Sequence, residues 1–455
     1  MQQRYWNNDE IVIGKMIYSL NGYGIILAEM GEEHSRNYKW ILLALLSATY
    51  FLAQGARQIF NAVLPQIKAD FAGAGITDTQ LGLVGSAFTL VFGLAIPFGG
   101  VLADFFSRKW MIVVGTLLFA VGIFSSGLAT GVVLLVVAYG VVNAAGQALL
   151  PPSNSSLIGQ FHVETRATAF SVYQIVFYIG IVVCSCVSGW LSGLGEGGWR
   201  RAFFLFGALA AAWAFALAFL LRDTPQVRKQ GIGKREERIG NREEDKASVS
   251  EALGAFLGKP SALLLMAGLG FYFYAKYGFN TWIINYLQCE FPSMTAASAS
   301  FHGVFWFYLG AVAGVFAGGR VSDRIAVALG RPQARFDVNA VGLVLCVPGL
   351  LLSAFAPTAA LCIVGTALFG FATGVYDSNI YASLFEVVKP RYRAAAVGVF
   401  GCGGSVIGAS GPAVLGWMNA HFSMSAGIAS LSAFALAGAA VIWIAKVFFF
   451  ERDKV

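Results

Sequence analysis

Three ionisable residues stand in the middle of long apolar stretches of the sequence: Arg57, Lys276 and Asp377. An ionised side chain at the centre of a bilayer costs roughly 2.5–3.5 kcal/mol on insertion scales, so such residues are rare and usually functional. Two cations that converge on one low-dielectric volume repel each other unless an anion lies between them. We therefore expect Arg57 to bind an anion through two parallel hydrogen bonds, and Lys276 to bind it as a point charge.

Polar residues accompany each of the two cations at helical spacing. The two polar faces consist of Tyr50, Gln54, Arg57 and Asn61 in one stretch and of Tyr272, Lys276 and Asn280 in the other. A polar face against lipid is costly, so we expect both faces to line one cavity. Weaker candidates for the same cavity are Gln147, Gln174 and Tyr381.

The three charges also permit other interpretations, which the sequence leaves open. In one of them both cations form internal ion pairs, for example Lys276 with Asp377, and the substrate is neutral. Asp377 itself is then the counter-ion of Lys276. Its other interpretations are a proton-coupling acid and a polar group that packs helices or accepts a hydrogen bond from a substrate hydroxyl.

The composition is that of an integral membrane protein. Of the 455 residues, 57% are hydrophobic and 12% are charged, which is about half the charged fraction of a soluble protein. Such a composition also excludes a disordered chain. The six Cys lie mostly in apolar runs, and the spacing of Cys184 and Cys186 is not that of zinc ligands. We therefore expect no disulfide framework, no metal and no cofactor.

Twelve stretches are long and apolar enough to cross a bilayer as helices, which takes about 20 residues each. They lie near 40–64, 79–103, 110–130, 132–159, 167–191, 201–221, 260–287, 297–320, 336–356, 359–386, 394–418 and 424–448. The expected fold class is therefore all-α integral membrane, with six-helix bundles at 40–221 and 260–448. The rest of the chain divides into an N-terminal segment at 1–39, a charged linker at 222–259 and a tail at 449–455.

Basic residues are distributed unevenly between the loops. If both termini are cytoplasmic, only three of the 31 Lys and Arg, namely Lys68, Arg200 and Arg201, fall in loops of the opposite side. The positive-inside rule therefore predicts this orientation, in a bacterial-type inner membrane.

The N-terminal segment contains an apolar run from Ile11 to Ala28 that is broken by Lys15, Asn21 and three Gly. The run is too interrupted to span a bilayer and lacks a signal-peptide cleavage pattern. We expect it either to lie on the inner membrane surface or to precede a true start at Met30.

Two short segments recur with the same offset of 219 residues. G-G-V-L-A-D at 99–104 recurs as G-G-R-V-S-D at 318–323, and A-R-Q-I-F-N at 56–61 recurs as A-K-Y-G-F-N at 275–280. Two matches with one offset indicate two structurally equivalent halves, and they put the two buried cations at corresponding places. Secondary transporters build alternating access from such repeats, with the binding site at mid-membrane.

Residues 99–109, G-G-V-L-A-D-F-F-S-R-K, resemble the loop 2–3 signature of the major facilitator superfamily, G-x-L-A-D-R-x-G-R-K. They depart from it at Phe105 and Ser107. The resemblance covers the chain from residue 40 and implies two pseudo-symmetric six-helix bundles. It also implies that the motif residues form an inner gate and do not bind substrate. These residues are Gly100, Asp104, Arg108 and Lys109 in the first copy and Gly319, Asp323 and Arg324 in the second.

Two branches of that superfamily resemble the chain more closely. An Arg in the first span with a cation at the equivalent place in the seventh resembles the pattern of the organophosphate:phosphate antiporters, although that branch has Arg in place of Lys276. The segments Y-F-Y-A-K-Y-G at 272–278 and R-D-T-P-Q at 222–226 also resemble that branch. The anion:cation symporters share the span-1 Arg but usually have acids where this chain has Ala56 and Gln147. Phosphate esters and carboxylates, including sugar acids, both remain open as substrates.

Together these features predict a secondary active transporter that moves a small organic anion by alternating access, driven by an ion gradient or by exchange, with Asp377 tuning or coupling the cycle. The alternatives are transport of a neutral sugar or drug, and a membrane sensor that binds without transporting. No P-loop, G-x-S-x-G or H-E-x-x-H motif occurs, so we expect no enzyme and no catalytic residue. The expected partners are the lipid bilayer, the substrate and a co-transported or exchanged ion, with no nucleic acid, and the protein is expected to be a monomer.

Overall fold

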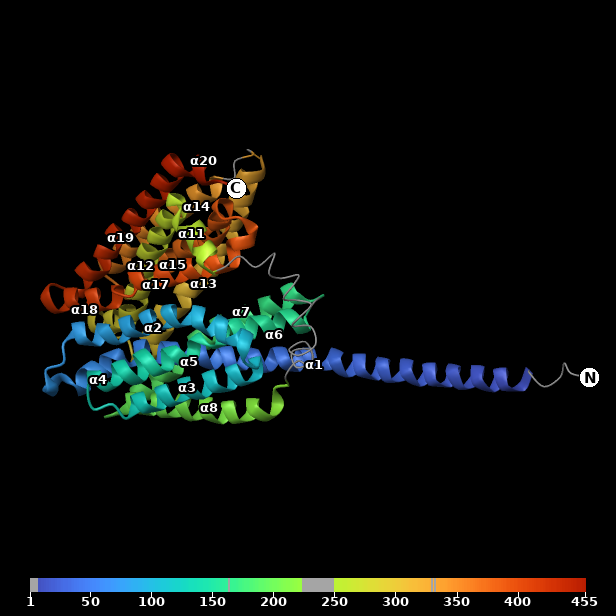
Figure 1. Cartoon of the computed structure of the whole chain (residues 1–455). Coiled ribbons are helices and arrows are strands. Elements are labelled where there is room, and N and C mark those ends of the chain that lie inside the picture. Colours follow the sequence, from blue (N-terminus) through green and yellow to red (C-terminus); the bar gives the residue numbers. More distant parts are fainter. Residues whose placement is uncertain (1–6, 163, 223–248, 329, 331–332) are drawn as a thin grey trace, which may run out of the picture.

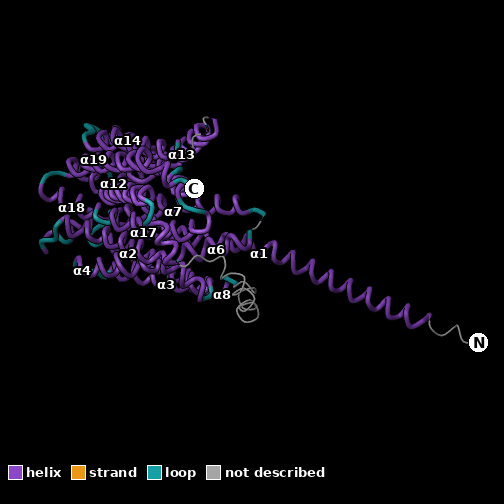
Figure 2. The backbone as a smooth tube through the Cα atoms, turned by 45° about the horizontal axis from the view of Figure 1, so that its top comes forward, coloured by secondary structure: helices purple, strands orange, loops and turns teal. Residues whose placement is uncertain are grey.

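The computed structural model describes residues 7–162, 164–222, 249–328, 330 and 333–455. Side chains are described from Tyr38 onward, apart from residues 103–104, 167, 249–250, 252, 327 and 394. The described chain is built from helices and contains no strand (Figure 2).

Within the described residues, twelve helical stretches are long and apolar enough to cross a membrane. They run Tyr38–Asp70, Asp78–Leu102, Arg108–Gly127, Val132–Phe161, Thr168–Ser192, Gly198–Leu220, Pro260–Glu290, Ala296–Ala326, Ala334–Ala354, Ala359–Val387, Ala395–His421 and Met424–Asp453. The prediction of an all-α fold with twelve membrane-spanning helices is therefore confirmed.

The first half of the chain is the lower bundle in Figure 1. Its helices are α1 (Asn7–Asp70), α2 (Asp78–Phe105), α3 (Arg108–Gly127), α4 (Val132–Leu135), α5 (Ala144–Ala148), α6 (Leu150–Phe161), α7 (Arg166–Ser192) and α8 (Gly198–Leu220). A π-helical segment, Val136–Asn143, joins α4 to α5. The first part of α1 extends away from the bundle as a single helix (Figure 1).

The second half repeats this arrangement. Its helices are α11 (Val249–Leu257), α12 (Pro260–Glu290), α13 (Ala296–Ala328), α14 (Ala334–Ala354), α15 (Ala359–Asp377), α16 (Ile380–Val387), α17 (Arg393–Gly408), α18 (Gly411–His421), α19 (Met424–Ile444) and α20 (Phe450–Asp453). Most of the expected linker at 222–259 falls on residues 223–248, outside the described residues, and α11 occupies its last part.

The fourth and tenth spans are both interrupted inside the bundle. In the fourth span the helix breaks at Leu149, and α6 begins with Pro151 and Pro152 in its first turn. In the tenth span α15 ends at Asp377 and α16 begins at Ile380. Non-helical backbone at membrane depth is tolerated where protein buries it or where it lines a cavity, so these breaks mark the helices that can carry a site.

The halves meet through α7 against α13 and α2 against α17 and α18. We call the end of the bundle where α8 ends and α12 begins the linker end. The opposite end, where α1 ends and α2 begins, is called the distal end. This pairing leaves a central volume between α1 and α12, the two helices that carry the buried cations.

Candidate substrate-binding site

A cavity of about 260 Å³ lies between the two halves. Residues of α1, α2 and α7 line one wall, and residues of α12, α13 and the end of α15 line the other. Arg57, Lys276 and Asp377 all reach this cavity. Both polar helix faces of the sequence therefore contribute to one chamber, with one cation on each wall.

Lys276 is paired with an acid of its own half. Its Nζ donates hydrogen bonds to Asp377 Oδ2 at 2.9 Å and to Tyr272 OH at 2.7 Å. The side chains of Lys276 and Asp377 are 20% and 36% exposed, so the pair borders the cavity and is not sealed in the core. This is the internal pair that the alternative interpretation assigned to Lys276.

Asp377 owes its position to the helix break. It is the last residue of α15, where unpaired backbone carbonyls give a partial negative charge. A carboxylate is disfavoured there, and Lys276 offsets this cost. Ser378 Oγ donates to the carbonyl of Val375 at 2.7 Å, and Asn379 Nδ2 donates to the carbonyl of Gly318 at 3.3 Å. The Asn379 hydrogen bond ties the break to the glycine pair of the second motif copy.

Arg57 has a different environment. Its guanidinium carbon lies 4.9 Å from the centres of the Phe88 and Phe92 rings and 5.3 Å from the centre of the Tyr277 ring. Such stacking satisfies the faces of a guanidinium but leaves its N–H edge unused. Within the described part of the chain, Arg57 forms no ion pair and its guanidinium donates no hydrogen bond. Arg57 is thus a cation held in place by aromatic rings.

Amides and aromatic rings form much of the remaining lining, together with threonine and aliphatic side chains. Four residues expected from the sequence lie there, namely Gln54, Asn61, Gln174 and Asn280. The sequence reading did not single out Gln58, Phe88, Thr89, Tyr139 and Thr281, which also line the cavity. A helical-spacing signal existed for Gln58, because Gln58 lies one turn from Gln54.

Four other expected residues lie outside the cavity. Tyr50 stacks on Tyr173, with ring centres 4.2 Å apart. Gln147 is buried and donates to Asn143 Oδ1 at 2.8 Å. Tyr272 is buried behind Lys276, which it orients. Tyr381 lies beyond the break and packs near Phe400.

The expected gating residues lie at the linker end. Asp323 and Arg324 are exposed, Lys109 is half-buried, and Arg108 has a buried Nη1 that lacks a hydrogen-bond partner in the described structure. The side chain of Asp104 lies outside the described residues.

In each glycine pair of the motif, only the first glycine (Gly99 or Gly318) lies close to a neighbouring helix. A Cβ on Gly100 or Gly319 would meet nothing within 4 Å. A Cβ on Gly99 would lie 2.8 Å from the carbonyl oxygen of Ala148, and one on Gly318 would lie 2.6 Å from Ser378 Oγ. The close helix contact in each motif copy therefore involves the first glycine, Gly99 or Gly318. The gating role expected for Gly100 and Gly319 stays a prediction. Each contact is made beside the break of the span against which it packs.

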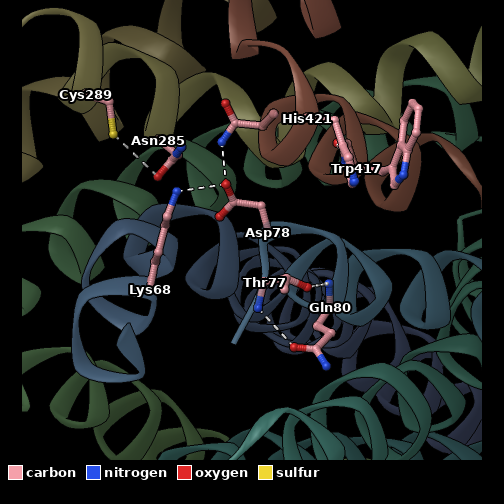
Figure 3. Close-up of polar contacts among 9 residues, drawn as sticks. Lys68, Thr77, Asp78, Gln80, Asn285, Cys289, Trp417 and His421 are labelled. Carbon is pink, nitrogen blue, oxygen red and sulfur yellow. Dashed lines mark hydrogen bonds and ion pairs between the residues drawn. The ribbon is translucent and has the colours of Figure 1, made fainter. Parts of the chain in front are cut away.

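The distal end is closed by hydrogen bonds between the halves. Asp78, the first residue of α2, accepts from Lys68 Nζ at 2.8 Å and from Asn419 Nδ2 of α18 at 2.5 Å (Figure 3). Gln66 Nε2 donates to Gln288 Oε1 at 3.1 Å, which joins α1 to α12. Asp78 is 8% exposed, and the N-terminus of α2 favours its negative charge. These contacts hold the two halves together at the distal end.

Comparison with known proteins places the chain in a family. The sequence profile of the Major Facilitator Superfamily matches residues 46–326 and 292–455. A relative named "Probable sulfoacetate transporter SauU", from Cupriavidus necator, is 25% identical over 83% of this chain and 86% of its own length. The D-galactonate transporter of Escherichia coli O6:H1 is 24% identical over 88% of this chain and 94% of its own length.

The fold is also similar to that of solved transporters. A bacterial homologue of the human lysosomal transporter Spinster, in an inward-facing and unoccupied conformation, has a TM-score of 0.78 and 21% identity over 92% of this chain and 98% of that one. The profile match covers well over half of the chain, and the twelve spans and the repeated halves agree with it. The chain therefore belongs to the major facilitator superfamily.

Proposed function

We propose that this protein is a secondary active transporter that carries a small organic anion by alternating access. One observation carries the proposal: Arg57 lines the central cavity, and its guanidinium has no ion pair and an unused N–H edge among the described residues. Burying such a cation is costly unless an anion compensates for it. A bound carboxylate, sulfonate or phosphate supplies that compensation.

The relatives support the same class of substrate. Besides sulfoacetate and galactonate, their names give cis,cis-muconate in Acinetobacter baylyi and hexuronate in Escherichia coli. All of these are organic anions of small size. Carboxylates and phosphate esters both remain within the proposal, since hexose phosphate transport proteins are also among the relatives.

Arg57 binds the anionic head in this proposal, and the amide side chains hold the rest of the cargo. Gln54 and Gln174 on one wall and Asn280 on the other offer both donors and acceptors to substrate hydroxyls. The aromatic rings around them exclude water, which strengthens the electrostatic attraction to Arg57. Lys276 adds a second cation whose charge Asp377 offsets.

Transport requires the distal contacts and the linker-end contacts to open in turn. The closed distal end and the likeness to an inward-facing structure support an inward-open state, with the linker end cytoplasmic in an inner membrane. The motif residues Asp104, Arg108, Lys109, Asp323 and Arg324 then form the inner gate in the opposite state. In this proposal Asp377 tunes or couples the cycle, which an ion gradient or exchange drives.

Flux measurements in proteoliposomes test this proposal. The purified chain is expected to take up galactonate, and Arg57→Gln is expected to lower uptake at least about a hundredfold because one buried charge pair is lost. Arg201→Gln, which alters an exposed arginine at the distal end, is the matched control and should retain normal uptake. Uptake of uncharged galactitol with no anion uptake would overturn the proposal, and binding without any flux would favour a sensor.

A neutral substrate is the second candidate, and one observation favours it. Lys276 is already neutralised by Asp377, so only one of the two cations needs an anion from outside the protein. The galactitol measurement described above separates the two candidates.

A further inference from the structure

We infer that Asp377 sets the charge of the cargo, so that the chamber accepts a singly charged organic anion and disfavours a doubly charged one. This inference rests on the proposed function and adds to it a rule for the substrate's net charge. It follows from the number and placement of the charges around the cavity, and it makes Asp377 a specificity-determining residue.

The described residues that line the cavity include two cations and one acid: Arg57, Lys276 and Asp377. The lining therefore carries one net positive charge. One negative charge on the cargo brings the closed chamber to neutrality. A second negative charge would leave an excess negative charge in a volume from which water is largely excluded, where an uncompensated charge is costly.

The position of Asp377 strengthens this effect. Its Oδ2 is held by Lys276 at 2.9 Å, yet more than a third of the side chain remains exposed toward the cavity. The carboxylate also stands at the C-terminal end of α15, whose carbonyls add a partial negative charge in the same place. A second anionic group that approached Lys276 would meet this negative end of the helix and the carboxylate together.

The two walls are therefore unequal. On the Arg57 side the guanidinium is flanked by Phe88, Phe92 and Tyr277, and its N–H edge has no partner among the described residues and can bind an anionic head. On the Lys276 side the ammonium already donates hydrogen bonds to Asp377 and Tyr272. The geometry fits a cargo with an anionic group at one end and an uncharged, hydrogen-bonding group at the other.

Two pairs of compounds isolate the charge of the cargo from its shape. Galactonate and galactarate differ only in whether the last carbon is an alcohol or a carboxylate, and isethionate and sulfoacetate differ in the same way. Titration calorimetry on the purified full chain at one fixed pH gives the affinity ratio within each pair. The wild-type protein is expected to bind the singly charged member at least about tenfold more tightly, since one additional charge interaction at an effective dielectric of about 20 has that size.

Three variants test whether net charge is the cause. Asp377→Asn raises the lining to two positive charges and should shift the affinity ratio at least about tenfold toward the doubly charged member. Lys276→Met combined with Asp377→Asn restores one net positive charge and should restore the wild-type ratio. The double variant also avoids the unpaired buried lysine that could destabilise the single variant. Asp337→Asn is the matched control, because Asp337 pairs with Lys446 away from the cavity.

The outcomes separate this inference from the proposed function. An unchanged ratio in Asp377→Asn, or a double variant that behaves like Asp377→Asn, would overturn the charge rule while leaving anion transport intact. Wild-type preference for the doubly charged members would also overturn it. If the wild-type protein binds no member of either pair, the anion proposal itself fails, and the charge rule fails with it.

Discussion

The guanidinium of Arg57 lies 5.3 Å from the ring centre of Tyr277, and the two residues come from opposite halves of the chain. Tyr277 follows Lys276, so the helix that carries the cation paired with Asp377 also positions Arg57. The contact joins α1 to α12 across the cavity. We therefore expect closure of the halves and the orientation of Arg57, the proposed anion-binding group, to be coupled through the side chain of Tyr277.

Removal of the Tyr277 ring is expected to weaken anion binding. A cation–π contact contributes about 0.5–2 kcal/mol, so Tyr277→Ala should reduce affinity about threefold to thirtyfold. Tyr277→Phe keeps the ring and should stay within about twofold of the wild type. Calorimetric titration with galactonate checks both variants, and equal losses in the two would show that the hydroxyl and not the ring face matters.

A covalent bridge across the distal end is expected to stop transport reversibly. Gln66 and Gln288 meet at 3.1 Å between the halves, so cysteines at these two positions can be joined by a short bifunctional methanethiosulfonate. Cys289 is adjacent and exposed, so the background should carry Cys289→Ser. Uptake should fall to background on bridging and return with dithiothreitol. Gln66→Cys alone is the control, and full activity of the bridged protein would mean that this end does not open.

Two adjacent glycines provide a test of the helix break beside Asp377. Gly318→Ala places a methyl group 2.6 Å from Ser378 Oγ and 2.9 Å from the Cα of Val375, so α15 must shift. We expect this variant to lower the unfolding temperature by several degrees, as overpacking typically costs about 1–3 kcal/mol. Gly319→Ala meets nothing within 4 Å and should be neutral or slightly stabilising. Equal melting temperatures for the two variants would contradict the contact.

The spans and the pairing of the halves could be predicted from the sequence because both leave local signals. Apolar runs of about 20 residues mark the helices, and the repeat with an offset of 219 marks Arg57 and Lys276 as equivalent. Placement of Gln54, Asn61 and Asn280 in the cavity follows from the helical period alone. These features need no knowledge of how distant helices pack.

The environment of each charge could not be predicted in the same way. Whether Lys276 or Arg57 pairs with Asp377 depends on contacts between residues about 100 or 320 positions apart in the chain, for which no local pattern exists. Gln147 is a polar residue within a span, as the lining residues are, yet its side chain bonds to Asn143 inside its own half. The distal contact of Asp78 with Asn419 links residues 341 positions apart and left no signal in either segment.

Equilibrium binding of galactonate to Arg57→Gln tests the account most directly. Calorimetry on the purified protein should show an affinity at least about a hundredfold below that of the wild type, since truncating one partner of a buried charge pair costs roughly 2–5 kcal/mol. Arg57→Lys keeps the positive charge but cannot form two parallel hydrogen bonds, so its affinity should lie between those of the wild type and Arg57→Gln. An Arg57→Gln protein that binds the same anion within about threefold of the wild-type affinity would contradict the assignment of Arg57 as the anion-binding group.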